Sequence, residues 1–272
     1  MPNMRRQKMA CRLGRASAVA LAILVSSAAT EAADCPRKGA LGTSRDMAVD
    51  PAIWPRIGRR DFAQSLPLRD HEVVLTFDDG PWPATTPRVQ RALARECVRA
   101  TFFLIGKPAS EFPWIVQATA AAGHSIGHHT WTHFSLRRMP YADAIGEIDH
   151  GISAVETAQH GVETTTPSTP FFRFPGFEST PATLDLLQSR GISVFSTDLL
   201  ADDWVRRTPQ QELNLLVKRL KLVNRGIILL HDPQVTTAAM LPAFLHYLKT
   251  HNYRVVHLVP AKPAGEREAS PH

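Results

Sequence analysis

The sequence predicts an α/β fold in which about seven parallel strands alternate with helices and close into a barrel. Apolar runs of strand length alternate with helix-like stretches from residue 72 to residue 258. Residues suited to chemistry follow five different strands of this set. An open, doubly wound sheet would gather such residues at one switch point, whereas a barrel collects them from many strand ends. The spread over five strands therefore favours the barrel.

The individual elements follow from local patterns. The helix Pro209–Val223 has Thr208 to cap it and Pro209 at its first position, with leucines and valines on one face. A second helix, near Thr236–Lys249, carries a similar apolar stripe. The expected strands are short apolar runs: Glu72–Phe77, Ala100–Ile105, Ser125–His128, Phe171–Phe174, Ser193–Thr197, Gly226–Leu230 and Tyr253–Leu258.

The chain is expected to divide into four parts. Residues 1–33 resemble a signal peptide, with a basic stretch followed by an apolar run too short for a comfortable membrane span, which needs about 20 residues. We therefore expect export, to the periplasm or as a secreted protein, without a stable membrane span once the leader is removed; an uncleaved anchor is the alternative. Residues 34–70 are expected to be an irregular wrapping segment with at most a short hairpin, 71–260 the barrel, and 261–272 a disordered tail.

Composition argues against nucleic acid as a partner. The 272 residues are 44% hydrophobic and 21% charged, with a net charge of +6. Five basic residues and one acidic residue lie in residues 1–33, so the rest of the chain has a net charge of only +2. Outside the leader two cysteines remain, and in an exported protein we expect a Cys35–Cys97 disulfide, with two unpaired thiols as the alternative.

Two carboxylates end the most apolar strand. The run Val73–Phe77 has the composition of a strand buried on both faces, and Asp78, Asp79, Gly80 and Pro81 follow it. Asp-Asp-Gly-Pro is also ordinary turn chemistry. At the C-terminal end of a barrel strand, however, adjacent carboxylates are suited to metal binding or proton transfer.

A histidine cluster follows another strand. His124, His128, His129 and His133 lie within ten residues, in two pairs spaced four apart, and either pair can present imidazoles to one cation. Spacing alone does not choose between the pairs. Chain order favours His129 and His133, because they fall at and beyond the C-terminal end of the expected strand.

Together, Thr76–Pro81 and His129–His133 resemble motifs of the polysaccharide deacetylase family, the NodB-like carbohydrate esterases. The resemblance extends from about Leu68 to Pro260 and implies a distorted barrel of β/α repeats. It implies that Asp78 is the general base and that Asp79, His129 and His133 hold a divalent metal ion. Zn²⁺ is the expected ion, with Co²⁺ or Ni²⁺ as alternatives, and it would activate water and polarise the carbonyl under attack.

Three further segments resemble family motifs. Arg173 would orient Asp78, and the Gly176 N–H would help to bind the oxyanion. The family usually has Tyr-Gly where this chain has Gly176-Phe177, which puts the aromatic groove wall in doubt. A looser match implies that Asp203 supports the catalytic pair and that Trp204 lines the acetyl pocket. Asp198 or Asp202 could replace Asp203 in that role, and a solvated acidic loop is the structural alternative.

The last motif follows the strand Gly226–Leu230. By the resemblance, His231 would be the general acid that protonates the leaving amine, and Leu229 would pack against the acetyl methyl. The expected activity is removal of N-acetyl groups from glycans that contain N-acetylglucosamine, such as peptidoglycan, a chitin-like oligomer or an exopolysaccharide. The alternatives are an O-acetyl esterase acting on acetylated xylan-type polysaccharide and a catalytically inactive glycan-binding barrel.

Overall fold

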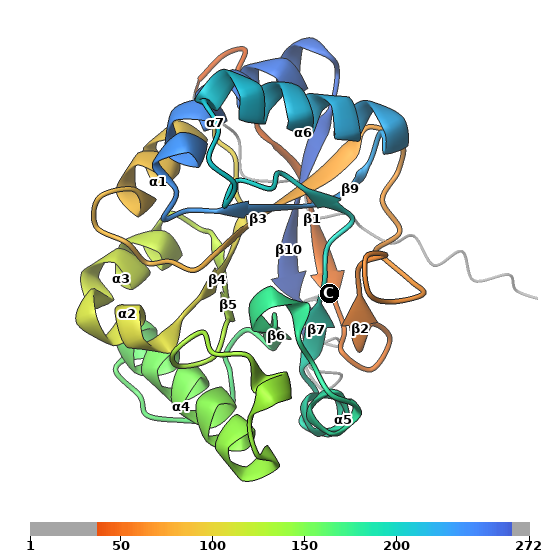
Figure 1. The fold of residues 1–272 in the computed structure, drawn as a ribbon. Helices are drawn as coiled ribbons and strands as arrows, with labels where there is room; N and C mark the ends of the chain where they lie inside the picture. The colour runs from red at the N-terminus through yellow and green to blue at the C-terminus, as the bar shows by residue number, and fades with distance from the viewer. Residues whose placement is uncertain (1–36, 263–272) are drawn as a thin grey trace, which may run out of the picture.

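A computed structural model describes residues 37–262 and has the α/β architecture that the sequence predicts, with a core of strands surrounded by helices (Figure 1). The predicted leader, most of the predicted tail and Cys35 lie outside these residues, so the leader and the Cys35–Cys97 disulfide stay predictions. Every strand pairing is parallel. The strands are β1 (Thr43–Val49), β2 (Arg56–Ile57), β3 (Glu72–Asp78), β4 (Thr101–Leu104), β5 (Ser125–His128), β6 (Phe171–Phe172), β7 (Ser193–Phe195), β8 (Leu199–Leu200), β9 (Gly226–His231) and β10 (Arg254–Pro260).

The strand β3 pairs with three other strands in the wall of the distorted barrel. All seven of its residues are buried, as its continuous apolar sequence predicts. It pairs with β4, β9 and β10, and the sheet then runs from β4 through β5, β6 and β7 to β2. In the β3–β9 pairing, Asp78 lies in register with His231. Two residues of opposite predicted roles in proton transfer therefore meet at the same end of the barrel.

The helices form the outer layer (Figure 1), with α6 against α7 and α7 against α1 on one side, and α2 and α3 against α4 on another. The helix α6 coincides with the predicted range, and Thr208 caps it in a capping box with Gln211. Between residues 37 and 262 no helix has the length and apolarity to cross a membrane. The helices are α1 (Thr86–Arg95), α2 (Gly106–Glu111), α3 (Pro113–Ala121), α4 (Tyr141–His160), α5 (Pro181–Ser189), α6 (Pro209–Val223) and α7 (Val235–Thr250).

The segment before β3 is more regular than expected. It contains β1, a seven-residue strand that pairs with β10 along most of its length, and β2, which pairs with β7. The expectation of an irregular segment with at most a short hairpin is corrected here. The sequence of β1 is largely polar, and its order comes from pairing with a strand about 210 residues later along the chain. No local pattern encodes such a pairing.

The helix α4 approaches the loop after β5 at a glycine. A Cβ atom added to Gly151 would lie 2.4 Å from the carbonyl carbon of Thr130 and 2.6 Å from its oxygen. Real Cβ contacts are not that short, so a side chain here would push α4 away from the His129–His133 loop. Gly146, on the exposed side of the same helix, has no atom within 4 Å of the equivalent position.

We expect Gly151→Ala to destabilise the protein, because backbone must move to make room, at a cost of about 1–3 kcal/mol. Gly146→Ala should be neutral or stabilising by up to about 1 kcal/mol, because alanine favours the helix. Denaturant unfolding of both variants tests this pair. Equal stability of the two variants would contradict the tight approach of α4 to the loop.

Candidate metal centre and hydrolytic site

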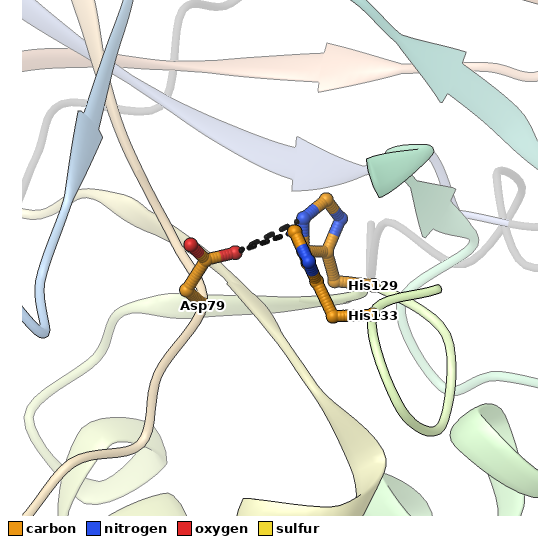
Figure 2. A group of neighbouring side chains, drawn as sticks. All are labelled: Asp79, His129 and His133. Carbon is orange, nitrogen blue, oxygen red and sulfur yellow. Dashed lines mark ion pairs between the residues drawn. The ribbon is translucent and has the colours of Figure 1, made fainter. Parts of the chain in front are cut away.

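Three side chains converge at the C-terminal end of the barrel (Figure 2). Asp79 follows β3, and His129 and His133 follow β5. The Oδ1 atom of Asp79 lies 3.3 Å from His129 Nε2 and 3.1 Å from His133 Nε2, and one potential ligand atom from each residue lies within 4.8 Å of the others. One carboxylate and two imidazoles form a donor set suited to a divalent transition metal, with positions left open for other ligands.

The donor atoms fit a cation. Asp79 Oδ1 is buried and has no hydrogen-bond partner among the described residues. The Nδ1 atom of His129 donates to the carbonyl oxygen of Arg173 at 2.6 Å, and Nε2 is therefore the ring atom that faces Asp79. Burial opposes ionisation of Asp79, but the two imidazoles hold the pKa of its carboxyl well below the ordinary value. These three residues can therefore hold a metal ion.

The other two histidines of the cluster point elsewhere. His124 Nδ1 accepts a hydrogen bond from the Ala100 N–H, and burial lowers the pKa of His124 to about 3. His128 contacts Glu156 and the carbonyl oxygen of Phe171, each at 3.2 Å. The geometry favours one of the two pairs, because His129 and His133 face Asp79, whereas His124 and His128 are buried and make other contacts.

The predicted base is held by a buried arginine. Arg173 is fully buried, and its Nη1 atom donates to Asp78 Oδ1 at 2.7 Å and to Thr76 Oγ1 at 2.9 Å. Its Nη2 atom donates to the Ser196 carbonyl at 2.9 Å, and the guanidinium lies 4.2 Å from the centre of the Phe103 ring. Asp78 Oδ2 lies 3.9 Å from His129 Nε2. One carboxylate oxygen of Asp78 is thus paired with Arg173, while the other faces the candidate metal centre.

The predicted acid is held by a carboxylate. His231 Nδ1 donates to Asp203 Oδ1 at 2.7 Å, and the His231 backbone N–H donates to Asp203 Oδ2 at the same distance. Burial alone would lower the pKa of His231, but Asp203, Asp79 and Asp78 together raise it to about 9. His231 Nε2 lies 4.0 Å from Asp79 Oδ2. The three carboxylates therefore favour the imidazolium form of His231.

Of the three acidic residues near β8, only Asp203 reaches His231. Asp202 forms an ion pair with Arg219, and Asp198 accepts hydrogen bonds from Ser65 and from the backbone of Arg59 and Ile227. Of the three candidates for the supporting carboxylate, the geometry therefore favours Asp203 over Asp198 and Asp202.

A second layer lies behind Asp203. Thr237 Oγ1 is 2.6 Å from Asp203 Oδ2 and 3.1 Å from Glu212 Oε1. The Thr237 hydroxyl has one proton, which it can donate to Asp203. The contact with Glu212 is then also a hydrogen bond if the Glu212 carboxyl is protonated and donates to Thr237 Oγ1. Burial, with the nearby charge of Asp203, raises the pKa of Glu212 to about 7. Sequence reasoning missed Thr237 and Glu212, because no motif includes either residue and they reach Asp203 from the helices α7 and α6.

The predicted substrate residues share one hollow of about 310 Å³. Gly176, Trp204 and Leu229 line it together with the five predicted metal and proton-transfer residues. The Trp204 ring is half exposed and meets His231 edge to face, with 5.5 Å between ring centroids. Sequence reasoning missed four other lining residues: Arg60, Phe174, Phe177 and Gln234. A larger hollow of about 520 Å³ lies beside Gly226, at the opposite end of β9.

Comparison with known proteins assigns the family. Residues 66–195 match the polysaccharide deacetylase family model. A chitooligosaccharide deacetylase of Azorhizobium caulinodans is 33% identical over 172 residues, which cover 62% of this chain and 78% of that protein. The chain belongs to the polysaccharide deacetylase family.

Other members of the family agree with this assignment. The peptidoglycan-N-acetylglucosamine deacetylase PgdA of Listeria monocytogenes is 29% identical over 186 residues, covering 68% of this chain. The chain spans only 37% of the length of that relative. The solved structure of the peptidoglycan deacetylase Bd3279 of Bdellovibrio bacteriovorus superposes with a TM-score of 0.72 at 29% identity, covering 85% of this chain and 63% of that one. The distorted barrel predicted from the sequence is confirmed.

The raised pKa of Glu212 predicts a pH-dependent stability. The pKa of Glu212 is about 7 in the folded protein, above the ordinary 4.5. Its contribution to the stability of the fold is therefore complete below pH 4.5 and is lost as pH rises through 7. Glu212→Gln cannot ionise, and its stability relative to wild type should increase by about 2 kcal/mol between pH 5 and pH 8. Denaturant unfolding at both pH values measures the difference. Glu163→Gln, at an exposed position, is the control. If the stability of Glu212→Gln relative to wild type is the same at pH 5 and pH 8, the prediction is contradicted.

Proposed function

We propose that this protein is a metal-dependent hydrolase that removes N-acetyl groups from glycans containing N-acetylglucosamine and releases acetate. The proposal depends on one observation: a three-residue cation site, an arginine-held carboxylate and an aspartate-held imidazole all line one hollow. Relatives are named for peptidoglycan N-acetylglucosamine and for chitooligosaccharides, which supports an acetamide on a glycan as the substrate. Peptidoglycan, a chitin-like oligomer or an exopolysaccharide would be the polymer, and residues 1–33 support action in the periplasm or outside the cell.

Asp79, His129 and His133 would hold the cation, and two histidines with one carboxylate suit Zn²⁺. A divalent cation bound there supplies Lewis acidity, which polarises the acetamide carbonyl and makes water more acidic. Asp78, through the oxygen not paired with Arg173, would accept a proton from the attacking water. Gly176 would offer its N–H to the carbonyl oxygen as negative charge develops.

His231 would complete the reaction. As the C–N bond breaks, its imidazolium would give a proton to the leaving nitrogen, which becomes the amine of the sugar. Asp203 accepts from Nδ1 and so presents Nε2 to the hollow. Leu229 is buried and would contact the acetyl methyl, and Trp204 would cover the other side of the acetyl group. The products are acetate and a free amine, and one water molecule is consumed.

Acetate release tests the proposed activity directly. Purified protein should release acetate from N-acetylglucosamine oligomers, lose the activity on chelation and recover it with Zn²⁺. Acetylated xylan is the comparison substrate, because faster release from the ester would favour an O-acetyl esterase. Sugar binding without acetate release under Zn²⁺, Co²⁺ or Ni²⁺ would refute the enzyme and favour a glycan-binding protein.

Two substitutions should separate metal binding from proton transfer. His133→Ala removes a ligand and should weaken Zn²⁺ binding by roughly 100-fold or more, measured by titration calorimetry of the metal-free protein. Asp78→Asn should keep metal binding within a few-fold and lower kcat by roughly 10²–10⁴-fold. His246→Ala, on the exposed side of α7, is the control for removal of an imidazole. Full Zn²⁺ affinity in His133→Ala would exclude the assigned metal centre.

A further inference from the structure

We propose that Arg60 selects glycans that carry a carboxylate beside the sugar being deacetylated. This inference rests on the proposed function and narrows its substrate class. Arg60 lines the same hollow as Asp79, His129 and His133. Arg60 lies before residues 66–195, which match the family model.

The backbone around Arg60 is held against the core. Gly58 has φ +110°, and a Cβ atom there would lie 2.6 Å from backbone atoms of Ser196 and Thr197. Glycine is therefore required for the loop to pass this close to the end of β7. Two residues later, the Arg60 N–H donates to the Thr197 carbonyl at 3.0 Å. The main chain thus delivers Arg60 to the wall of the hollow from a fixed position.

The side chain is also oriented. The guanidinium carbon of Arg60 lies 4.4 Å from the centre of the Phe177 ring, a cation–π arrangement. Phe177 itself has φ +62°, in the loop that also carries Gly176. The Gly-Phe sequence put the aromatic groove wall of the family motif in doubt. In this chain Phe177 supplies an aromatic wall to the hollow, and the Arg60 guanidinium lies over its ring.

The charges around the hollow leave Arg60 available for an anion. Arg173 is committed to Asp78, and Asp79 belongs to the cation site. Asp61 contacts Arg60 only through Nη1, at 3.2 and 3.4 Å, and this ion pair is partly exposed. Within the described chain, Nε and Nη2 of Arg60 make no hydrogen bond. A guanidinium edge can bind a carboxylate with two hydrogen bonds.

This chemistry distinguishes two classes of glycan. A chitin-like oligomer offers hydroxyl and acetamide groups, which give Arg60 no opposite charge. A glycan in which N-acetylglucosamine alternates with an acidic sugar places a carboxylate within one residue of the acetamide. The carboxylate could come from the lactyl ether of N-acetylmuramic acid or from a uronic acid. Both present the same anion to Arg60, and the experiment separates them.

The test compares kcat/KM for three oligomers of equal length. One is neutral N-acetylglucosamine, one alternates it with N-acetylmuramic acid, and one alternates it with glucuronic acid. In the wild type, at least one acidic oligomer should be preferred to the neutral one, and Arg60→Gln should lower that preference about tenfold. Arg60→Lys should retain part of the preference, and 0.5 M salt should weaken it. Arg59→Gln should leave it unchanged, because Arg59 lines the other hollow, beside Gly226.

The outcomes are distinct. A proportional loss on all three oligomers in Arg60→Gln, or no change in the preference, overturns the role of Arg60 while the deacetylase activity stands. No acetate from any oligomer with wild-type protein and metal overturns the proposed function itself. The neutral oligomer also serves as the internal control for folding, because selectivity is a ratio measured on one preparation of each variant.

Discussion

The buried ion pair between Arg173 and Asp78 is the interaction on which the site depends. A guanidinium with no exposed surface needs hydrogen-bond partners, and Asp78, Thr76 and the carbonyl oxygens of Phe195 and Ser196 provide them. The main-chain carbonyl oxygen of Arg173 also accepts a hydrogen bond from Nδ1 of His129. Arg173 therefore orients the predicted base with its side chain and a predicted metal ligand with its main chain. Removing one partner from such a pair typically costs about 3–5 kcal/mol.

Several predicted functional groups are positioned by neighbouring residues that have no predicted contact with the substrate. Asp203 holds His231, and Thr237 and Glu212 lie behind it. Gly151 lets α4 approach the loop that carries His129 and His133. Packing thus leaves these side chains few alternative positions. The binding hollow, by contrast, is formed largely by loops, including those that carry Arg60 and Phe177.

The local parts of this structure were predictable from sequence. The limits of α6 follow from Thr208, Pro209 and a regular apolar stripe, and β3 follows from an unbroken apolar run. The strand β1 was missed because its partner is β10, near the other end of the chain. Motifs named the residues that the structure brings together around Asp79. Arg60, Thr237 and Glu212 were missed because their proximity to the site comes from tertiary packing, which spacing along the chain does not encode.

The register of β3 with β9 has a wider consequence. Asp78 and His231 are paired positions on adjacent parallel strands, and a shift of one residue would turn either side chain to the opposite face of the sheet. Main-chain hydrogen bonds therefore set the spacing of Asp78 and His231, the predicted proton acceptor and proton donor, independently of the loops above them. Insertions or substitutions in those loops can alter which polymer is accepted and leave this spacing intact.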